Sequence, residues 1–188
     1  MTRVHFVKKA RKDYPQYGIQ KGESYYWWKF RYGPKSMSKT PPRQSELTQS
    51  DFLSRVYGVQ EDLEDLSASD FDQDIEEERD NVVSELEELR DETQEKHDNM
   101  PDQLQESETG QLLQERVDSL DSMISDLQSV DCEIDEESIR QEIISEYAKP
   151  EELTEEQKEE IEEKVREAIE KKRQEIIDEL IEIQYEGE

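Results

Sequence analysis

A run of aromatic and basic residues near the start of the chain contains the side chains best suited to chemistry. The sequence "YYWWKFRY", residues 25–32, joins four consecutive aromatic rings to Lys29 and Arg31. Cations of this kind neutralise phosphates and aromatic rings stack on bases, so the combination is typical of nucleic-acid contact. The pattern predicts a nucleic-acid-binding surface in this part of the chain.

The charge of the chain is divided in a way that supports this prediction. Residues 1–50 contain 11 Lys and Arg against 3 Asp and Glu, a net charge of +8. Residues 51–188 contain 13 against 49, a net charge of −36, and the whole chain carries −28. The predicted nucleic-acid-binding residues are Arg3, Lys9, Arg11, Tyr25, Trp27, Lys29, Arg31, Lys35, Lys39 and Arg43.

A small antiparallel sheet must position these residues. Residues 3–11 alternate between apolar and polar, residues 25–32 are dense in aromatics, and "GPK" predicts a reversal into a short third strand over residues 36–40. Because side chains alternate along a strand, the aromatic strand has two different faces. We expect Tyr26, Trp28, Phe30 and Tyr32 to point inward, and Tyr25, Trp27, Lys29 and Arg31 to point outward.

A meander this small needs an element to cover its apolar face. Residues 47–67 carry a helical stripe, with Thr48 or Ser50 as the N-cap, and we expect this helix to pack on the sheet. Gly58, in the middle of the helix, would allow a close approach. Two alternatives to nucleic-acid contact remain open for the outward face: packing under a neighbouring helix with ordinary solvated lysines, and a protein-binding surface.

A resemblance adds to this interpretation. The segment "YYWWKFRYGPKSMSKTPPRQSELTQSDF" resembles the opening of an uncharacterised family of phage- and plasmid-encoded small proteins, which continues into an acidic helical remainder. More loosely, its aromatic strand, Gly turn and "SKT" strand are similar to the three-stranded, AP2-like arm-binding domains of phage integrases. The first resemblance implies a viral or mobile-element source, and neither implies any catalytic residue.

The remainder of the chain predicts helices with narrow apolar seams. Asp70 is the expected N-cap of a second helix that ends near residue 99, and Pro101 stops it. The seam of this helix is Ile75, Val82, Leu86, Leu89 and Met100, and that of the third helix is Leu113, Val117, Leu120, Ile124 and Leu127. Two seams of similar length joined by a short loop predict an antiparallel helical hairpin.

Two more helices are predicted after the hairpin. Asp135 caps a short helix that contains Ile139, Ile143 and Tyr147, and residues 148–153 interrupt the helical pattern. Thr154 with Gln157 forms a capping box for a long last helix, whose seam Lys172 interrupts. The fold class is therefore α+β, with expected domains at 1–68, 69–131 and 132–188.

The acidic helices have several possible uses. They could form a coiled-coil arm for homo-oligomers or a partner helix, or an intramolecular bundle in which every seam is covered. Their negative surface could bind a basic protein, in the extreme as a DNA mimic that inhibits a host defence system. They could also fold over the basic segment and compete with nucleic acid for it. The acidity could instead keep the protein hydrated in a high-salt proteome, or simply reflect solvated helix faces.

The sequence contains no pattern typical of catalysis. The six glycines form no phosphate-binding loop, and the carboxylates are too numerous to single out a catalytic pair. His5 and His97 lie on a strand and at a polar helix end, Cys132 is alone, and residues 70–80 lack the spacing of an EF-hand loop. We expect no enzyme, no catalytic residue, no metal and no cofactor.

The same patterns bear on location. No apolar run approaches the ~20 residues of a membrane span, and the first residues lack the apolar core of a signal peptide. A single cysteine fits a reducing compartment. We expect a cytoplasmic protein with no membrane contact, in the host cytoplasm if the source is viral.

Overall fold

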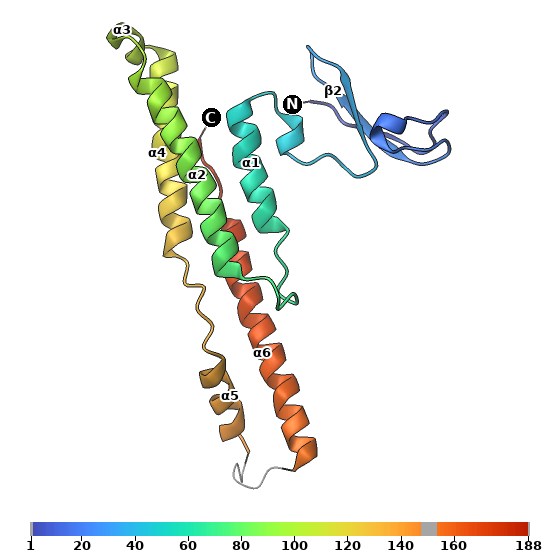
Figure 1. The fold of residues 1–188 in the computed structure, drawn as a ribbon, viewed down its shortest axis with the longest axis vertical. Coiled ribbons are helices and arrows are strands. Elements are labelled where there is room, and N and C mark those ends of the chain that lie inside the picture. The colour runs from blue at the N-terminus through green and yellow to red at the C-terminus, as the bar shows by residue number, and fades with distance from the viewer. Residues whose placement is uncertain (1, 148–153, 188) are drawn as a thin grey trace. The chain divides into compact units, whose positions relative to one another are not determined.

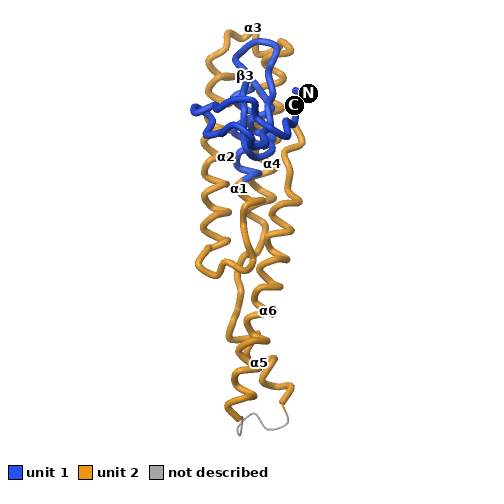
Figure 2. The backbone as a smooth tube through the Cα atoms, turned by 90° about the vertical axis from the view of Figure 1, so that its right-hand side faces the viewer, with its two compact units in different colours: residues 1–61 blue, residues 62–188 orange. Residues whose placement is uncertain are grey.

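The computed structural model describes residues 2–147 and 154–187. The chain forms two compact units, residues 1–61 and residues 62–188 (Figure 2). The first contains a three-stranded sheet and the second consists of helices, so the predicted α+β class is confirmed. The predicted interruption at residues 148–153 lies outside the described residues.

The sheet of the first unit is an antiparallel meander (Figure 1). Its strands are β1, His5–Val7; β2, Tyr25–Lys29; and β3, Lys35–Ser38, in the order β1-β2-β3. Each strand is shorter than the segment predicted for it. β2 ends at Lys29 because the chain turns toward β3, and Gly33 in this turn has a φ of 134°, which favours glycine. The strict alternation of faces therefore does not extend to residues 31 and 32.

One face of the sheet packs on a loop instead of a helix. Ala10, Ile19 and Tyr25 form a buried cluster, and the partly buried residues against it are Val7, Tyr14, Tyr17, Trp27 and Met37. The loop includes a short 3-10 helix, η1, Pro15–Tyr17. It is fixed to the sheet by the Tyr17 hydroxyl, which donates to the carbonyl oxygen of Lys35 at 2.8 Å. For this face, the alternative of packing under a neighbouring helix is thus corrected, because a loop covers it.

Trp28 lies on the other face of β2 and is 3% exposed. Its indole N–H donates to the carbonyl oxygen of Glu46 at 3.1 Å, in the 3-10 helix η2, Ser45–Leu47. The Ser45 hydroxyl in turn donates to Glu61 Oε2 at 2.6 Å. Glu61 belongs to α1, Asp51–Glu64, so η2 connects the sheet to this helix.

The first helix begins as the capping pattern predicts but has no close neighbour at its glycine. The Leu53 N–H donates to Ser50 Oγ at 3.3 Å, which makes Ser50 the residue that caps α1. A Cβ added at Gly58 would meet nothing within 4 Å. The predicted close approach of another element at Gly58 is therefore wrong.

The second unit contains two pairs of packed helices and a short helix, α3, in the connection between α2 and α4 (Figure 1). The helices are α2, Ile75–Asp98; α3, Asp102–Gln105; α4, Glu108–Ser129; α5, Glu136–Ser145; and α6, Glu155–Glu182. α2 packs along α4, which confirms the predicted hairpin, and α5 packs along α6. The N-cap of α2 is Asp74 rather than Asp70, since its carboxylate accepts from the N–H groups of Glu76 and Glu77. The predicted caps Asp135 and Thr154 are confirmed.

The predicted seams of α2 and α4 are mostly buried within this one chain. The buried seam residues are Ile75, Val82, Leu86, Leu89, Val117, Leu120, Ile124 and Leu127. Ile161, Val165 and Ile169 of α6 form a separate cluster with partly buried residues of α5. Seams covered in this way favour the intramolecular bundle, because they leave little apolar surface for a partner helix.

The seam of α6 contains a buried arginine. Lys172, the predicted interruption, is exposed, whereas Arg173 is only 8% exposed. Arg173 Nε donates to the carbonyl oxygen of Ala68 at 3.0 Å, and Nη2 donates to those of Asp70 and Gln73 at 2.7 Å each. The guanidinium therefore holds the segment before α2, all of it within the second unit. No helix in the described part of the chain is both long and apolar enough to cross a membrane.

Candidate nucleic-acid interface

The aromatic residues of the candidate interface do not point as the sequence predicted. Tyr25, expected outward, is 6% exposed, and burial raises the pKa of its hydroxyl. Tyr32, expected inward, is 72% exposed. Alternation along β2 correctly groups Tyr25 with Trp27, but it cannot tell which face is covered. The loop of residues 10–19 covers that face, and so Tyr25 cannot contact a nucleic acid.

Trp27 is half-buried and is already in contact with two side chains of the sheet. The His5 ring stacks on it with centroids 4.2 Å apart and planes 11° from parallel. Lys35 Nζ lies 3.9 Å from the ring centroid, in cation–π contact. His5 comes from β1 and Lys35 from β3, so these contacts approach from opposite sides of β2. Trp27 therefore has little ring surface left for a base.

The predicted cations fall into two groups. Lys39 is paired with Glu23 at 3.0 Å, and Arg31 lies over the Tyr32 ring at 5.4 Å from its centroid. Within residues 2–147 and 154–187, no carboxylate pairs with the exposed side chains of Arg3, Lys8, Lys9, Arg11 or Lys29. Four of these five were predicted, and Lys8 was missed. Arg43 is exposed and its backbone N–H donates to Glu46 Oε2 at 3.0 Å.

Most arginines of the second unit are bound by the chain itself. Arg90 contacts Asp91 at 2.8 Å and Asp121 at 3.1 Å, and these hydrogen bonds raise its pKa. Arg140 pairs with Glu162, and Arg79 with Asp80 at 2.8 Å. Cations available to an outside phosphate are thus concentrated in the first unit.

Sequence reasoning missed the aromatic residues that are accessible on the sheet. Phe6 of β1 pairs in register with Tyr26 of β2, and their ring centroids are 4.9 Å apart. Phe6 is 53% exposed and Tyr26 is partly exposed. The alternation of residues 3–11 groups Phe6 with Val4 and Ala10, which predicts a core position. Only the cover of the opposite face shows that Phe6 lies on the open one.

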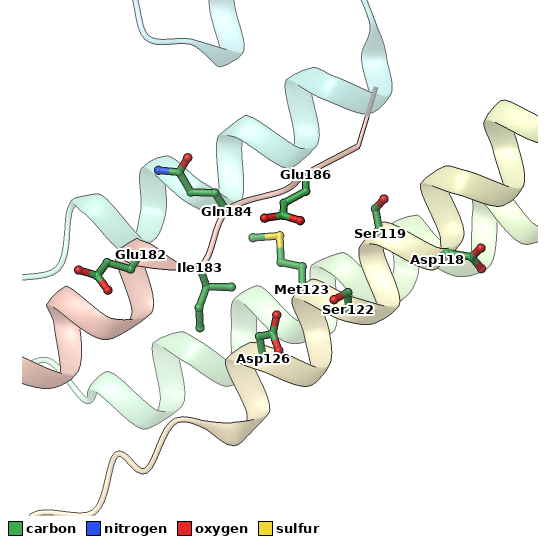
Figure 3. Close-up of a pocket in the computed structure, with 9 residues that line it drawn as sticks. All are labelled: Asp118, Ser119, Ser122, Met123, Asp126, Glu182, Ile183, Gln184 and Glu186. Carbon is green, nitrogen blue, oxygen red and sulfur yellow. The ribbon is translucent and has the colours of Figure 1, made fainter.

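The second unit has a groove of another character (Figure 3). It has a volume of about 470 Å³ and lies between α4 and the residues at the end of α6. Met123, only 2% exposed, and Ile183 provide apolar surface inside it. The carboxylates that line it are Asp118, Asp126, Glu182 and Glu186. The groove combines negative charge with an apolar floor.

The remaining candidates for chemistry are isolated groups. Cys132 is half-buried, and burial raises the pKa of its thiol although Arg79 Nη1 lies 3.5 Å from the sulfur. A thiol of this kind is a weak nucleophile. Among the described residues, no three His, Cys, Asp or Glu side chains are grouped closely enough to hold a metal ion. Comparison with protein-family models, with curated protein sequences and with solved structures gave no match.

Proposed function

We propose that this chain is a non-enzymatic nucleic-acid-binding accessory protein that binds through its first unit. The viral or mobile-element source implied by the resemblance, a cytoplasmic location, and a role of the helices in recruiting a partner or a second copy are parts of the same proposal. The phosphate-binding residues are the exposed cations Arg3, Lys8, Lys9, Arg11 and Lys29, assisted by Arg31 and Arg43.

One observation supports the proposal above all others. An acidic chain gains nothing in solubility from a basic segment, and its own carboxylates are abundant enough to pair every cation. In the second unit this is what happens, since most of its arginines are paired with carboxylates or carbonyl groups of the same unit. Exposed cations that have no carboxylate partner among the described residues include Arg3, Lys8, Lys9, Arg11 and Lys29, all in the first unit. Unpaired cations clustered on one small unit are what a polyanion requires.

The test is a salt-dependent binding titration with a charge-reversal variant. We expect the protein to bind a labelled mixed-sequence DNA, with an affinity that falls steeply between about 50 and about 200 mM salt. Lys29→Glu with Arg31→Glu should weaken binding and reduce the salt slope by about one for each phosphate that the variant no longer neutralises. Lys171→Glu with Lys172→Glu is the matched control, because it changes the net charge equally on exposed positions of α6. Equal affinities of the two double variants would contradict the proposal.

A second candidate function rests on the groove between α4 and the end of α6. Four carboxylates around Met123 and Ile183 suit a basic segment of a partner protein that also carries an apolar side chain. If this chain acts as a DNA mimic, the partner is a DNA-binding protein. We expect Asp126→Asn with Glu186→Gln to weaken binding of an Arg- and Lys-rich peptide, measured by fluorescence anisotropy. Asp131→Asn with Glu133→Gln is the control, since both side chains are exposed and neither lines this groove. A peptide that binds all three proteins equally would exclude the groove.

A further inference from the structure

The sheet of the first unit has one covered face and one partly open face. The cluster of Ala10, Ile19 and Tyr25 occupies the first. On the other face the register places Phe6, Tyr26 and Ser38 side by side across the three strands. We call these three residues the Phe6 row. An apolar ring left in water forgoes the favourable free energy of burial, and adjoining exposed rings are typical of binding surfaces.

The Phe6 row has the form of a stacking surface. The Phe6 and Tyr26 rings lie 4.9 Å apart, centroid to centroid, and are tilted by 43°, so each leaves part of a ring accessible. The third member is a small serine, whose hydroxyl lies 3.1 Å from that of Thr40. Farther along β2, Trp28 is buried and its N–H is bound to Glu46, which closes the open face at that end. The accessible ring surface therefore suits one or two bases.

Exposed cations lie close to Phe6 in the sequence. Lys8 and Lys9 follow β1 directly, two and three residues after Phe6, and Arg3 precedes Phe6 by three residues. All three side chains are exposed and have no carboxylate partner in the described part of the chain. β1 is an edge strand of the sheet, so no further strand separates these side chains from solvent. Long cationic side chains at both ends of β1 are of the type that binds phosphates on either side of a stacked base.

The chemistry of the row distinguishes between forms of nucleic acid. Duplex DNA is read through hydrogen bonds to base edges, which need amides, guanidiniums or carboxylates in the groove. Phe6 has no polar atom in its side chain, and the faces of stacked bases in a duplex are inaccessible to it. Unpaired bases expose their faces, and aromatic side chains stack on them with little dependence on sequence.

From these observations we infer that the first unit binds single-stranded nucleic acid, with a base stacked on Phe6 and Tyr26 and with phosphates at Lys8, Lys9 and Arg3. This inference rests on the proposed function and specifies its ligand. It replaces Tyr25 and Trp27 by Phe6 and Tyr26 as the residues that contact bases. DNA and RNA strands share the relevant chemistry, so both are included in the test.

The experiment measures binding of the full chain to labelled oligonucleotides by fluorescence anisotropy. The probes are a mixed-sequence DNA strand of about 16 nucleotides, the upper site size of one small binding domain, its RNA equivalent and the matching DNA duplex. The variant is Phe6→Ala, and the control is Tyr32→Ala, which removes a ring that is 72% exposed and lies outside the strands. Tryptophan fluorescence checks that both variants keep the fold, because Trp27 and Trp28 belong to β2.

We expect the wild-type protein to bind one or both single strands more tightly than the duplex. Phe6→Ala should lower the single-strand affinity about 5- to 140-fold, the value of one stacked base, and leave the salt slope unchanged. Tyr32→Ala should keep the wild-type preference. Equal binding of strand and duplex that is insensitive to Phe6→Ala would overturn the inference but leave the proposed function intact. Absence of binding to every probe would overturn both.

Discussion

Arg173 gives the sharpest test of how the second unit is held together. Its guanidinium is 8% exposed and donates to three carbonyl oxygens, those of Ala68, Asp70 and Gln73. The perturbation is Arg173→Met, which keeps a long side chain and removes every donor. Met also leaves no uncompensated charge, so the measured change reports the hydrogen bonds that are removed.

The expected loss follows from the burial of the three acceptors. A hydrogen bond to a charged group contributes about 1.5–3 kcal/mol, and a buried acceptor left without a donor costs about 1–3 kcal/mol. Ala68 is 6% exposed, so its carbonyl stays desolvated in the variant. Asp70 is exposed and Gln73 half-exposed, so water replaces the guanidinium there. We therefore expect a loss of about 3 kcal/mol, or about 6–12 °C in melting temperature for a chain of this size.

The assay is thermal and urea denaturation followed by circular dichroism at a helical wavelength. Arg166→Met is the control, because Arg166 is exposed and shares with Arg173 only the contact with Phe71, at 5.3 Å against 5.5 Å. An exposed cation–π contact contributes about 0.5–1 kcal/mol, so the control should lose no more than that. If Arg173→Met is as stable as Arg166→Met, the carbonyl contacts do not stabilise the unit and the reasoning is refuted.

The other predictions also concern stability. Gly58→Ala should stabilise the chain by about 1 kcal/mol, because Ala favours the helix and nothing lies within 4 Å of the added Cβ. Gly110→Ala should lower stability by about 1–3 kcal/mol, because its Cβ would lie 2.6 Å from Gln105 Cα. Melting temperatures decide both, and a fall for the first or a rise for the second would contradict the packing described. Hydrogen bonds from Ser138 lower the pKa of Asp135, the cap of α5, so its contribution is complete above the ordinary pKa of 3.8 and is lost as the pH falls below it. Asp135→Ala should flatten this acid-side loss in a pH series of melting curves, and an unchanged pH dependence would count against the cap. Added salt should raise the melting temperature of a chain with a net charge of −28, since it screens repulsion between carboxylates. A fall between about 0.1 and about 1 M NaCl would exclude that repulsion as a major contribution.

Local patterns in the sequence were sufficient for most of the secondary structure. The capping box at Thr154 and the cap at Asp135 are confirmed because a cap depends on residues within four positions of one another. The α2–α4 hairpin is confirmed because both seams repeat at helical spacing and the connection is short. The N-cap of α2 is Asp74 instead of the predicted Asp70. Aspartates occupy positions 70, 72 and 74, and each of them satisfies the local rule for an N-cap.

The tertiary structure decided which faces of these elements are covered. Alternation assigned Tyr25 and Trp28 correctly to opposite faces of β2, but both are buried because separate segments, residues 10–19 and η2, cover the two faces. The same contacts leave Phe6 exposed, although the alternation of its segment predicts a core position.

Arg173 illustrates the same division for the helices. Its place four residues after Ile169 puts it in the seam of α6, whereas the sequence predicted the interruption at the neighbouring Lys172. Its partners lie about 100 residues earlier in the chain and are backbone carbonyls, which every residue has and no sequence pattern distinguishes. The sequence by itself determined the order of the strands and the long helices, most of the helix caps and the division of charge, because these depend on residue type and short spacing. Only the tertiary structure decided which rings and cations remain accessible, because burial depends on segments that are distant in sequence.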